Sequence, residues 1–138
     1  MSVSTLEAGR RLGISAPRIQ HWISRSFLPC PHDGWDARSA TRILLMQELL
    51  SSGLPSTMAG IAAATLAKAG TLTAGAHLVV TAEPQPDGGV RYHASIVTGQ
   101  PDTSDARVAV CVPLDPIRAR VAAAWRFAHR LTQRHPTP

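Results

Sequence analysis

The stretch LGISAPRIQHWISRSFLP, residues 12–29, decides how the first half of this chain folds. Gly13 is the residue type that usually follows the end of a helix, and Ser15 is a good N-cap for the next helix. That second helix should cover residues 16–26, with Pro17 tolerated in its first turn. Two helices joined by so short a turn predict a helix-turn-helix.

The helix predicted over residues 16–26 separates apolar from polar side chains. Ile19, Trp22 and Ile23 fall on one stripe at about 100° per residue. The other side carries a set without any carboxylate: Pro17, Arg18, Gln20, His21, Ser24 and Arg25. In the DNA major groove, arginine can bind guanine and glutamine can bind adenine, whereas a carboxylate would be repelled by phosphates. The polar face therefore predicts base contacts with double-stranded DNA, and its alternative is an ordinary solvated helix face.

Three further helices are predicted in the first half. Ser4–Glu7 fits a capping box, so a first helix should begin near Thr5, with Leu6, Ala8 and Leu12 able to face inward. Asp36 should cap a third helix over residues 37–52, which Gly53 ends. A fourth helix should run over residues 56–69.

Residues 29–36, PCPHDGWD, should form a short hairpin, or wing, because Asp33-Gly34 is a tight-turn signal. Arg38 and Arg42 follow the wing and are expected to contact phosphates, which supply affinity without base preference. His32 and Trp35 are weaker candidates for DNA contact, and for Trp35 packing of the wing is the favoured alternative.

After residue 70 the apolar period changes from that of a helix to that of a strand. Strands are predicted over residues 77–82, 90–98 and 107–112, and a final helix over residues 115–133. The expected fold class is therefore α+β. It comprises four helices with a winged helix-turn-helix, then a small three-stranded antiparallel sheet and a C-terminal helix. The division should fall near residues 70–76, which gives a DNA-binding domain at 1–70 and a βββα domain at 77–135.

The final helix carries an apolar seam with alternating spacings of three and four residues. Its members and their neighbouring indole are Ile117, Val121, Ala124, Trp125, Ala128 and Leu131. The seam could pair with its twin in a homodimer, or pack on the sheet of its own chain. A protein partner that binds through residues 77–135 is a further reading. Five arginines on the outer face of this helix could form a second phosphate contact, although a solvated face is the favoured interpretation.

Composition limits the function classes. The net charge is +5, which favours nucleic acid as partner. Cys30 and Cys111 have no zinc-type spacing, so neither a metal nor another cofactor is expected. Without a phosphate loop, a paired acidic cluster or a nucleophile motif, an enzyme is not expected either. No leader peptide or span of a bilayer is recognisable, so a cytoplasmic, nucleoid-associated protein without membrane contact is expected.

At this point the residues show a resemblance to a known family. LGISAPRIQHWISRSFLP, followed by DGWDARSATRILLMQELLSSGLP, resembles the winged helix-turn-helix of the MerR family over residues 3–68. Leu12–Ser15 match the opening of the motif, His21-Trp22 stand where the family has an aromatic pair, and Ile61 matches an apolar position. Gln20 replaces the usual arginine and Ser26 the usual glycine. The wing is short and lacks the usual arginine.

The resemblance implies a sequence-specific transcription regulator, bacterial or phage, acting as repressor or activator. Trimmed versions of this unit also look like phage repressors and excisionases. The alternatives are therefore an architectural protein that bends DNA for a recombinase, or a protein-interaction module with a vestigial helix-turn-helix. In the family a long dimerisation helix usually follows; here strands intervene, and no inducer pocket is expected.

Overall fold

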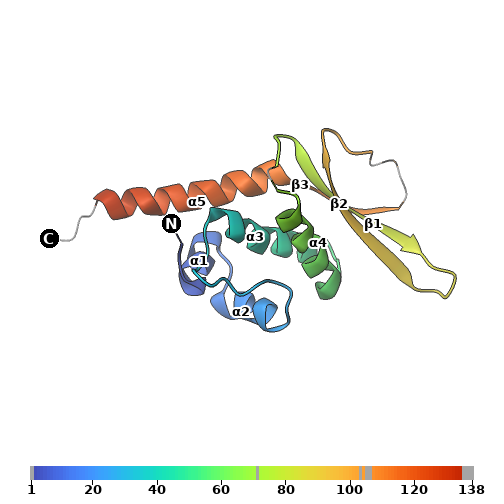
Figure 1. The fold of residues 1–138 in the computed structure, drawn as a ribbon, viewed down its shortest axis with the longest axis horizontal. Helices are drawn as coiled ribbons and strands as arrows, with labels where there is room; N and C mark the ends of the chain where they lie inside the picture. The colour runs from blue at the N-terminus through green and yellow to red at the C-terminus, as the bar shows by residue number, and fades with distance from the viewer. Residues whose placement is uncertain (1, 71, 103, 105–106, 135–138) are drawn as a thin grey trace. The chain divides into compact units, whose positions relative to one another are not determined.

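In the computed structural model, the described residues are 2–70, 72–102, 104 and 107–134, with only the helical backbone described beyond Arg126. Their elements follow in the order α1 (Thr5–Leu12), α2 (Ala16–Ser24), α3 (Ala37–Ser51), α4 (Ser56–Lys68), β1 (Ala76–Pro84), β2 (Val90–Thr98), β3 (Val108–Pro113) and α5 (Leu114–Arg134). The α+β layout of four helices, a three-stranded antiparallel sheet and a final helix is confirmed (Figure 1).

The chain forms two compact units, and their limits differ from the expected division near residues 70–76. The first unit combines the residues up to Leu44 with those from Ile117 onward, and the second runs from Leu45 to Pro116. The physical reason for the difference in the second unit is that α4 packs against β1 and β2 rather than closing a separate helical domain. Residues 45–70 therefore belong with the sheet.

The starts of α1 and α2 and the end of α1 lie where the capping residues predict them, whereas α2 ends at Ser24, two residues before its expected end. The Ser4 hydroxyl accepts a hydrogen bond from the Glu7 N–H at 3.2 Å, and the Ser15 hydroxyl accepts one from the Arg18 N–H at 3.4 Å. Gly13 adopts the left-handed conformation, with φ of 72°, and ends α1. These caps satisfy amide groups that a helix terminus otherwise leaves without partners.

The turn between α1 and α2 depends on Gly9. The Ile14 N–H donates to the Gly9 carbonyl at 3.0 Å, so the chain after Gly13 folds back onto α1. A β-carbon on Gly9 would collide with the Ile14 carbonyl oxygen. Only a residue without a side chain allows the turn to approach the helix this closely.

The core of the first unit contains the inward stripes of α1, α2 and the first half of α3. Its fully or almost fully buried side chains include Ala8, Leu12, Ile19, Trp22, Leu28, Trp35, Ala40 and Ile43. The expectation that Leu6 faces inward is wrong, because its side chain is 63% exposed. Ala8 and Leu12, which are four positions apart, define the buried stripe, and Leu6 lies two positions from Ala8, on the other side of the helix.

The expected wing hairpin over residues 29–36 is not formed. This segment is a loop with a single antiparallel bridge, which joins Trp35 to Val3 rather than to another residue of the loop. Pro29 and Pro31 have no N–H for a strand ladder, which explains why two paired strands do not form here. The Trp35 indole is fully buried and donates from Nε1 to the Thr5 hydroxyl at 3.0 Å.

Helix α5 contacts α1 in the same unit through individual side chains. The guanidinium of Arg11 lies 5.1 Å from the centroid of the Trp125 ring, and Nε of Arg11 donates to Glu7 at 3.2 Å. Arg120 reaches the carbonyl oxygen of Leu12, at the end of α1, with a bond of 2.9 Å. Helix α5 thus supplies a donor to a terminal carbonyl that α1 itself cannot satisfy.

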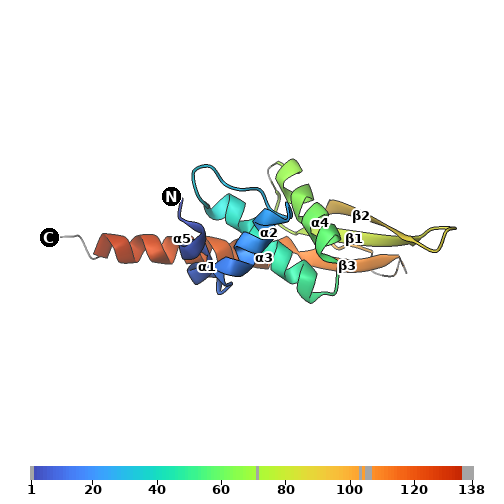
Figure 2. The ribbon, with the colours of Figure 1, turned by 90° about the horizontal axis from the view of Figure 1, so that it is seen from below.

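The sheet of the second unit has the strand order β2-β1-β3, with both pairs antiparallel. Leu78 lies opposite Ile96 on β2 and Val112 on β3, so alternate residues of the three strands build one apolar face. Helix α4 packs on this face, mainly over β2 (Figure 2). The predicted strands and their period of two residues are confirmed, with bounds shifted by one or two residues at most ends.

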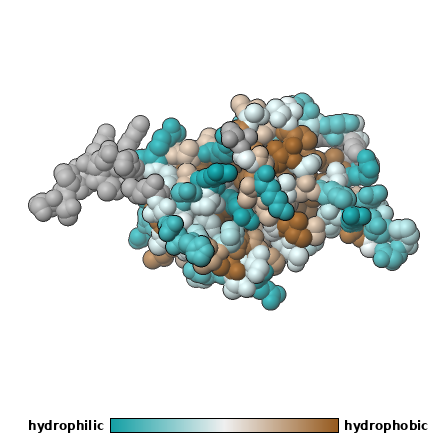
Figure 3. Space-filling view, viewed as in Figure 1, coloured by the Kyte–Doolittle hydropathy of each residue, from teal (hydrophilic) through white to brown (hydrophobic). Residues whose placement is uncertain are grey.

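Some large apolar side chains remain at the surface. Leu6, Ile61 and Val90 are 63%, 56% and 51% exposed. Figure 3 shows apolar residues in separate patches among hydrophilic ones on the face that it draws. Ile61, which the sequence resemblance matched to an apolar family position, points to solvent in this chain.

Candidate nucleic-acid interface

The exposed face of α2 brings together most of the residues that the sequence singled out. The buried side of this helix consists of Ile19 and Trp22, with Ile23 partly exposed. On the other side and at its ends the exposed residues are Pro17, Arg18, Gln20, His21, Ser24 and Arg25. The helix thus has one polar face without any acid, flanked by Arg18 and by the C-cap Arg25, and it is anchored by the buried Trp22 indole.

Two contacts order this polar face. The Arg18 guanidinium lies 5.3 Å from the centroid of the Trp22 ring, four residues further along the helix. Such a cation–π contact holds the arginine stem against the helix while its N–H donors stay in solvent. The Ser24 hydroxyl donates to the His21 carbonyl at 2.8 Å, so its proton is already used and its oxygen remains as an acceptor.

Helix α2 ends in a conformation that serine rarely adopts. Arg25 is the C-cap, and Ser26 follows with φ of 63°, the one positive φ at a non-glycine residue among those described. The family that the sequence resembles has glycine at this position, which suits the left-handed conformation. The local geometry thus agrees with a glycine position, although the residue here is serine.

The two arginines of α3 differ in their surroundings. Arg38 is exposed, whereas Arg42 is only partly exposed and its buried Nε has no hydrogen-bond partner. Burial lowers the pKa of the Arg42 guanidinium from its ordinary value. Arg38 is therefore the more accessible of the two guanidinium groups. Arg42 has a donor that an incoming anion could satisfy only if it reached this partly buried position.

His32 and Trp35, the two weaker candidates of the 29–36 loop, differ in their exposure to solvent. His32 is exposed and remains accessible to a ligand. Trp35 is removed from the candidate surface by its complete burial and by its hydrogen bond to Thr5. The favoured alternative for Trp35, in which its indole packs in the core, is the one observed.

The apolar seam of α5 is largely occupied within the chain. Ile117, Val121 and Trp125 are buried, at 7%, 1% and 7% exposed, and Ala124 is partly exposed. Residues buried in this way offer little surface to a second copy. Ala128 and Leu131, the remaining residues proposed for a dimer seam, have side chains outside the described part of the structure.

Two contacts around α1 and the turn that follows it were not predicted from the sequence. The contact between Arg120 and the Leu12 carbonyl joins residues far apart in the chain, and no local pattern signals it. The close approach at Gly9 had a visible signal, since a glycine inside a short amphipathic helix usually marks a packing constraint.

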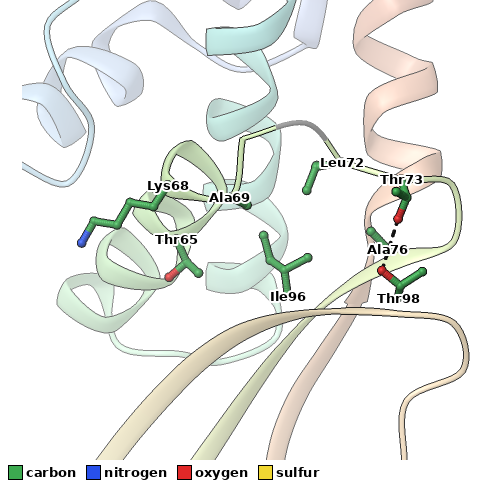
Figure 4. A pocket seen from close by; sticks show the side chains of 8 residues that line it. All are labelled: Thr65, Lys68, Ala69, Leu72, Thr73, Ala76, Ile96 and Thr98. Carbon is green, nitrogen blue, oxygen red and sulfur yellow. Dashed lines mark hydrogen bonds between the residues drawn. The ribbon is translucent and has the colours of Figure 1, made fainter.

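The second unit contains a groove that the sequence did not predict. It has a volume of about 440 Å³ and is lined by Thr65, Lys68, Ala69, Leu72, Thr73, Ala76, Ile96 and Thr98. The hydroxyls of Thr73 and Thr98 are 3.2 Å apart (Figure 4). The Lys68 amine points away from the other lining residues, so the groove is bordered by apolar groups and hydroxyls without a directed charge.

Within the described residues, no group of three or more His, Cys, Asp or Glu side chains could hold a metal ion, and no helix is long and apolar enough to cross a membrane. His77 and His93 share one face of the sheet but are not opposite each other, since His93 pairs with Thr81. Comparison of the chain with protein-family models and with curated proteins found no match.

Proposed function

We propose that this chain is a sequence-specific DNA-binding transcription regulator of MerR-like type that places α2 in the major groove. The observation that carries the proposal is the exposed face of α2. It combines Arg18, Gln20 and His21, three donors suited to base edges, and it contains no carboxylate.

The shape of the unit supports this proposal. In helix-turn-helix proteins the second helix enters the groove while the first crosses the backbone. Here the turn is fixed by Gly9 and by the caps Ser15 and Gly13, so α2 is held firmly against α1. A rigid support of this kind orients the exposed side chains for a fixed ligand.

Phosphate contacts would come from the cations around α2. Arg25 and Arg38 are both exposed, and the ion pairs that Glu7 forms with Arg10 and Arg11 do not involve them. Each phosphate neutralised by such a cation releases counterions, so affinity should fall steeply with salt. Because the 29–36 loop forms no hairpin, phosphate contact from a wing is not part of this proposal.

The test is selection of binding sequences from a random duplex pool, at two salt concentrations, with the full chain. We expect an enriched motif that persists at the higher salt, with weaker overall binding. Salt-sensitive binding without a motif would contradict the proposal and would favour an architectural protein that bends DNA. No binding beyond that of any basic protein would favour an interaction module instead.

A further inference from the structure

Strand β2 lies at an open edge of the sheet. In the order β2-β1-β3 it hydrogen-bonds to β1 only, so its other edge has no strand partner among the described residues. An edge strand presents a row of free N–H and C=O groups, which another strand can pair with. Proteins that remain monomeric usually protect such edges.

The two edges of this sheet differ in their protection. Strand β3 has six residues, ends at Pro113 and has an irregular register opposite Val80 and Thr81. Short length, proline and bulges are the usual devices that block edge pairing. Strand β2 has nine residues, no proline and a single charged residue, Arg91. It therefore lacks the protection that β3 has.

Part of the apolar face of the sheet is also left uncovered along β2. Val90, Tyr92, Ala94 and Ile96 alternate along the same face, and α4 covers the end that contains Ile96. The hairpin of β1 and β2 extends past α4 in both ribbon views (Figures 1 and 2). Val90 is 51% exposed there, and Tyr92 and Ala94 are partly exposed. Uncovered apolar side chains thus border an unpaired strand edge.

We propose that β2 pairs antiparallel with β2 of a second copy of this chain, so that the two sheets join into one. A two-fold axis perpendicular to the sheet pairs even-numbered with even-numbered residues. The apolar faces of both copies then become continuous.

The sequence of β2 suits a second copy as the occupant because it is self-complementary. With the axis through His93, Arg91 lies opposite Ser95, and with the axis through Ala94 it lies opposite Val97. Like charges therefore do not meet in either register, and Tyr92 lies beside a small or aliphatic side chain. Cross-strand pairs of aromatic with aliphatic residues stabilise antiparallel sheets.

This dimer does not depend on DNA binding. It uses only β2, whereas the proposed DNA contacts come from α2 and α3. Measuring the mass without DNA therefore separates a failure of this inference from a failure of the proposed function.

The experiment measures the mass of the full chain in solution by light scattering over a dilution series. The chain has a mass of 14.7 kDa, so a dimer should be about twice that, near 29 kDa. Ala94→Lys and Ala94→Glu each bring two like charges together near the axis and should weaken dimerisation about tenfold or more. Ala109→Lys, a change to lysine at an exposed residue of β3, is the matched control and should remain dimeric.

Mixing the two charge variants completes the test. The Ala94→Lys and Ala94→Glu variants should form a mixed dimer at concentrations at which each alone is monomeric, which misfolded proteins would not do. A monomeric wild-type chain would overturn the proposal. So would variants at position 94 that dimerise as strongly as the wild type, or a mixture that stays monomeric.

Discussion

Gly9 faces the carbonyl oxygen of Ile14 so closely that no β-carbon fits between them. Because the obstacle is a backbone atom in the turn, the collision cannot be relieved by rotating a side chain. The turn also holds the Ile14 N–H against the Gly9 carbonyl at 3.0 Å. The angle between α1 and α2 therefore depends on one residue without a side chain.

Gly9→Ala should destabilise the protein by about 1–3 kcal/mol, as overpacking typically does. The sign is informative, because glycine to alanine inside an ordinary helix stabilises by roughly 0.5–1 kcal/mol. Urea denaturation followed by circular dichroism would measure the difference. An unchanged or higher free energy of unfolding would contradict the close approach in this turn.

Ser26→Gly should stabilise the protein by about 0.5–1 kcal/mol. An L-residue in the left-handed conformation costs roughly 1–2 kcal/mol, and glycine removes this cost while adding some entropy to the unfolded chain. Ser26→Ala is the control, because alanine retains the strained φ of 63°. Thermal unfolding of the three proteins would compare them, and an equal gain for alanine would exclude backbone strain as the cause.

Asp36 caps α3, and its contribution to stability should depend on pH. The Ser39 N–H donates to its carboxylate at 2.8 Å, and this bond lowers the pKa of Asp36, while burial acts in the opposite direction. A carboxyl whose pKa is lower in the folded state stabilises the fold above its unfolded pKa, about 4, and loses this effect as pH falls through the folded value.

Asp36→Ala should therefore cost about 1 kcal/mol at neutral pH, the usual effect of removing an N-cap. The difference from the wild type should shrink in acid. Denaturation at neutral pH and near pH 3 would measure it, with Asp33→Ala, an exposed carboxylate of the preceding loop, as the control. A cost for Asp36→Ala that is the same at both pH values would rule out the ionised carboxylate as its source.

Local signals predicted the elements well because they act through neighbouring residues. Caps such as Ser4 and Ser15 fixed the helix starts, and the change of period after residue 70 identified the strands. The prediction of a wing hairpin was wrong because local signals carry no information about distant partners. Asp33-Gly34 signals a turn but cannot show which segment of the chain Trp35 pairs with. The residue that pairs with Trp35 is Val3, which lies far from it in the sequence, before α1.

The burial of some side chains depends on packing between distant segments, and the sequence could not predict it. The seam of α5 reads equally as a dimer surface or as core, and only the burial of Val121 and Trp125 distinguishes them. In the same way, Arg42 belongs to a polar pattern in the sequence but is partly buried in the fold. The exposure of the residues of α2 was easier to predict, because the period of an amphipathic helix alone separates its buried face from its exposed face.

Gln20→Ala should weaken binding to the selected DNA sequence by about 1–3 kcal/mol and leave binding to unrelated sequences almost unchanged. Gln20 is exposed, so the change should alter stability by less than about 0.5 kcal/mol. Arg18→Ala should have the same effect on base preference, with a small further loss of stability because its contact with Trp22 is removed. Fluorescence anisotropy with matched and scrambled duplexes would measure both.

Two variants complete this comparison. Arg38→Ala should weaken binding to all duplexes alike and reduce the slope of log affinity against log salt by about one, as expected for a phosphate contact. Gln100→Ala, the same change as in Gln20→Ala but in the loop after β2, should affect neither binding nor stability. If the α2 variants lost affinity equally for every sequence, α2 would be a phosphate-binding helix, and base recognition would have to come from elsewhere in the chain.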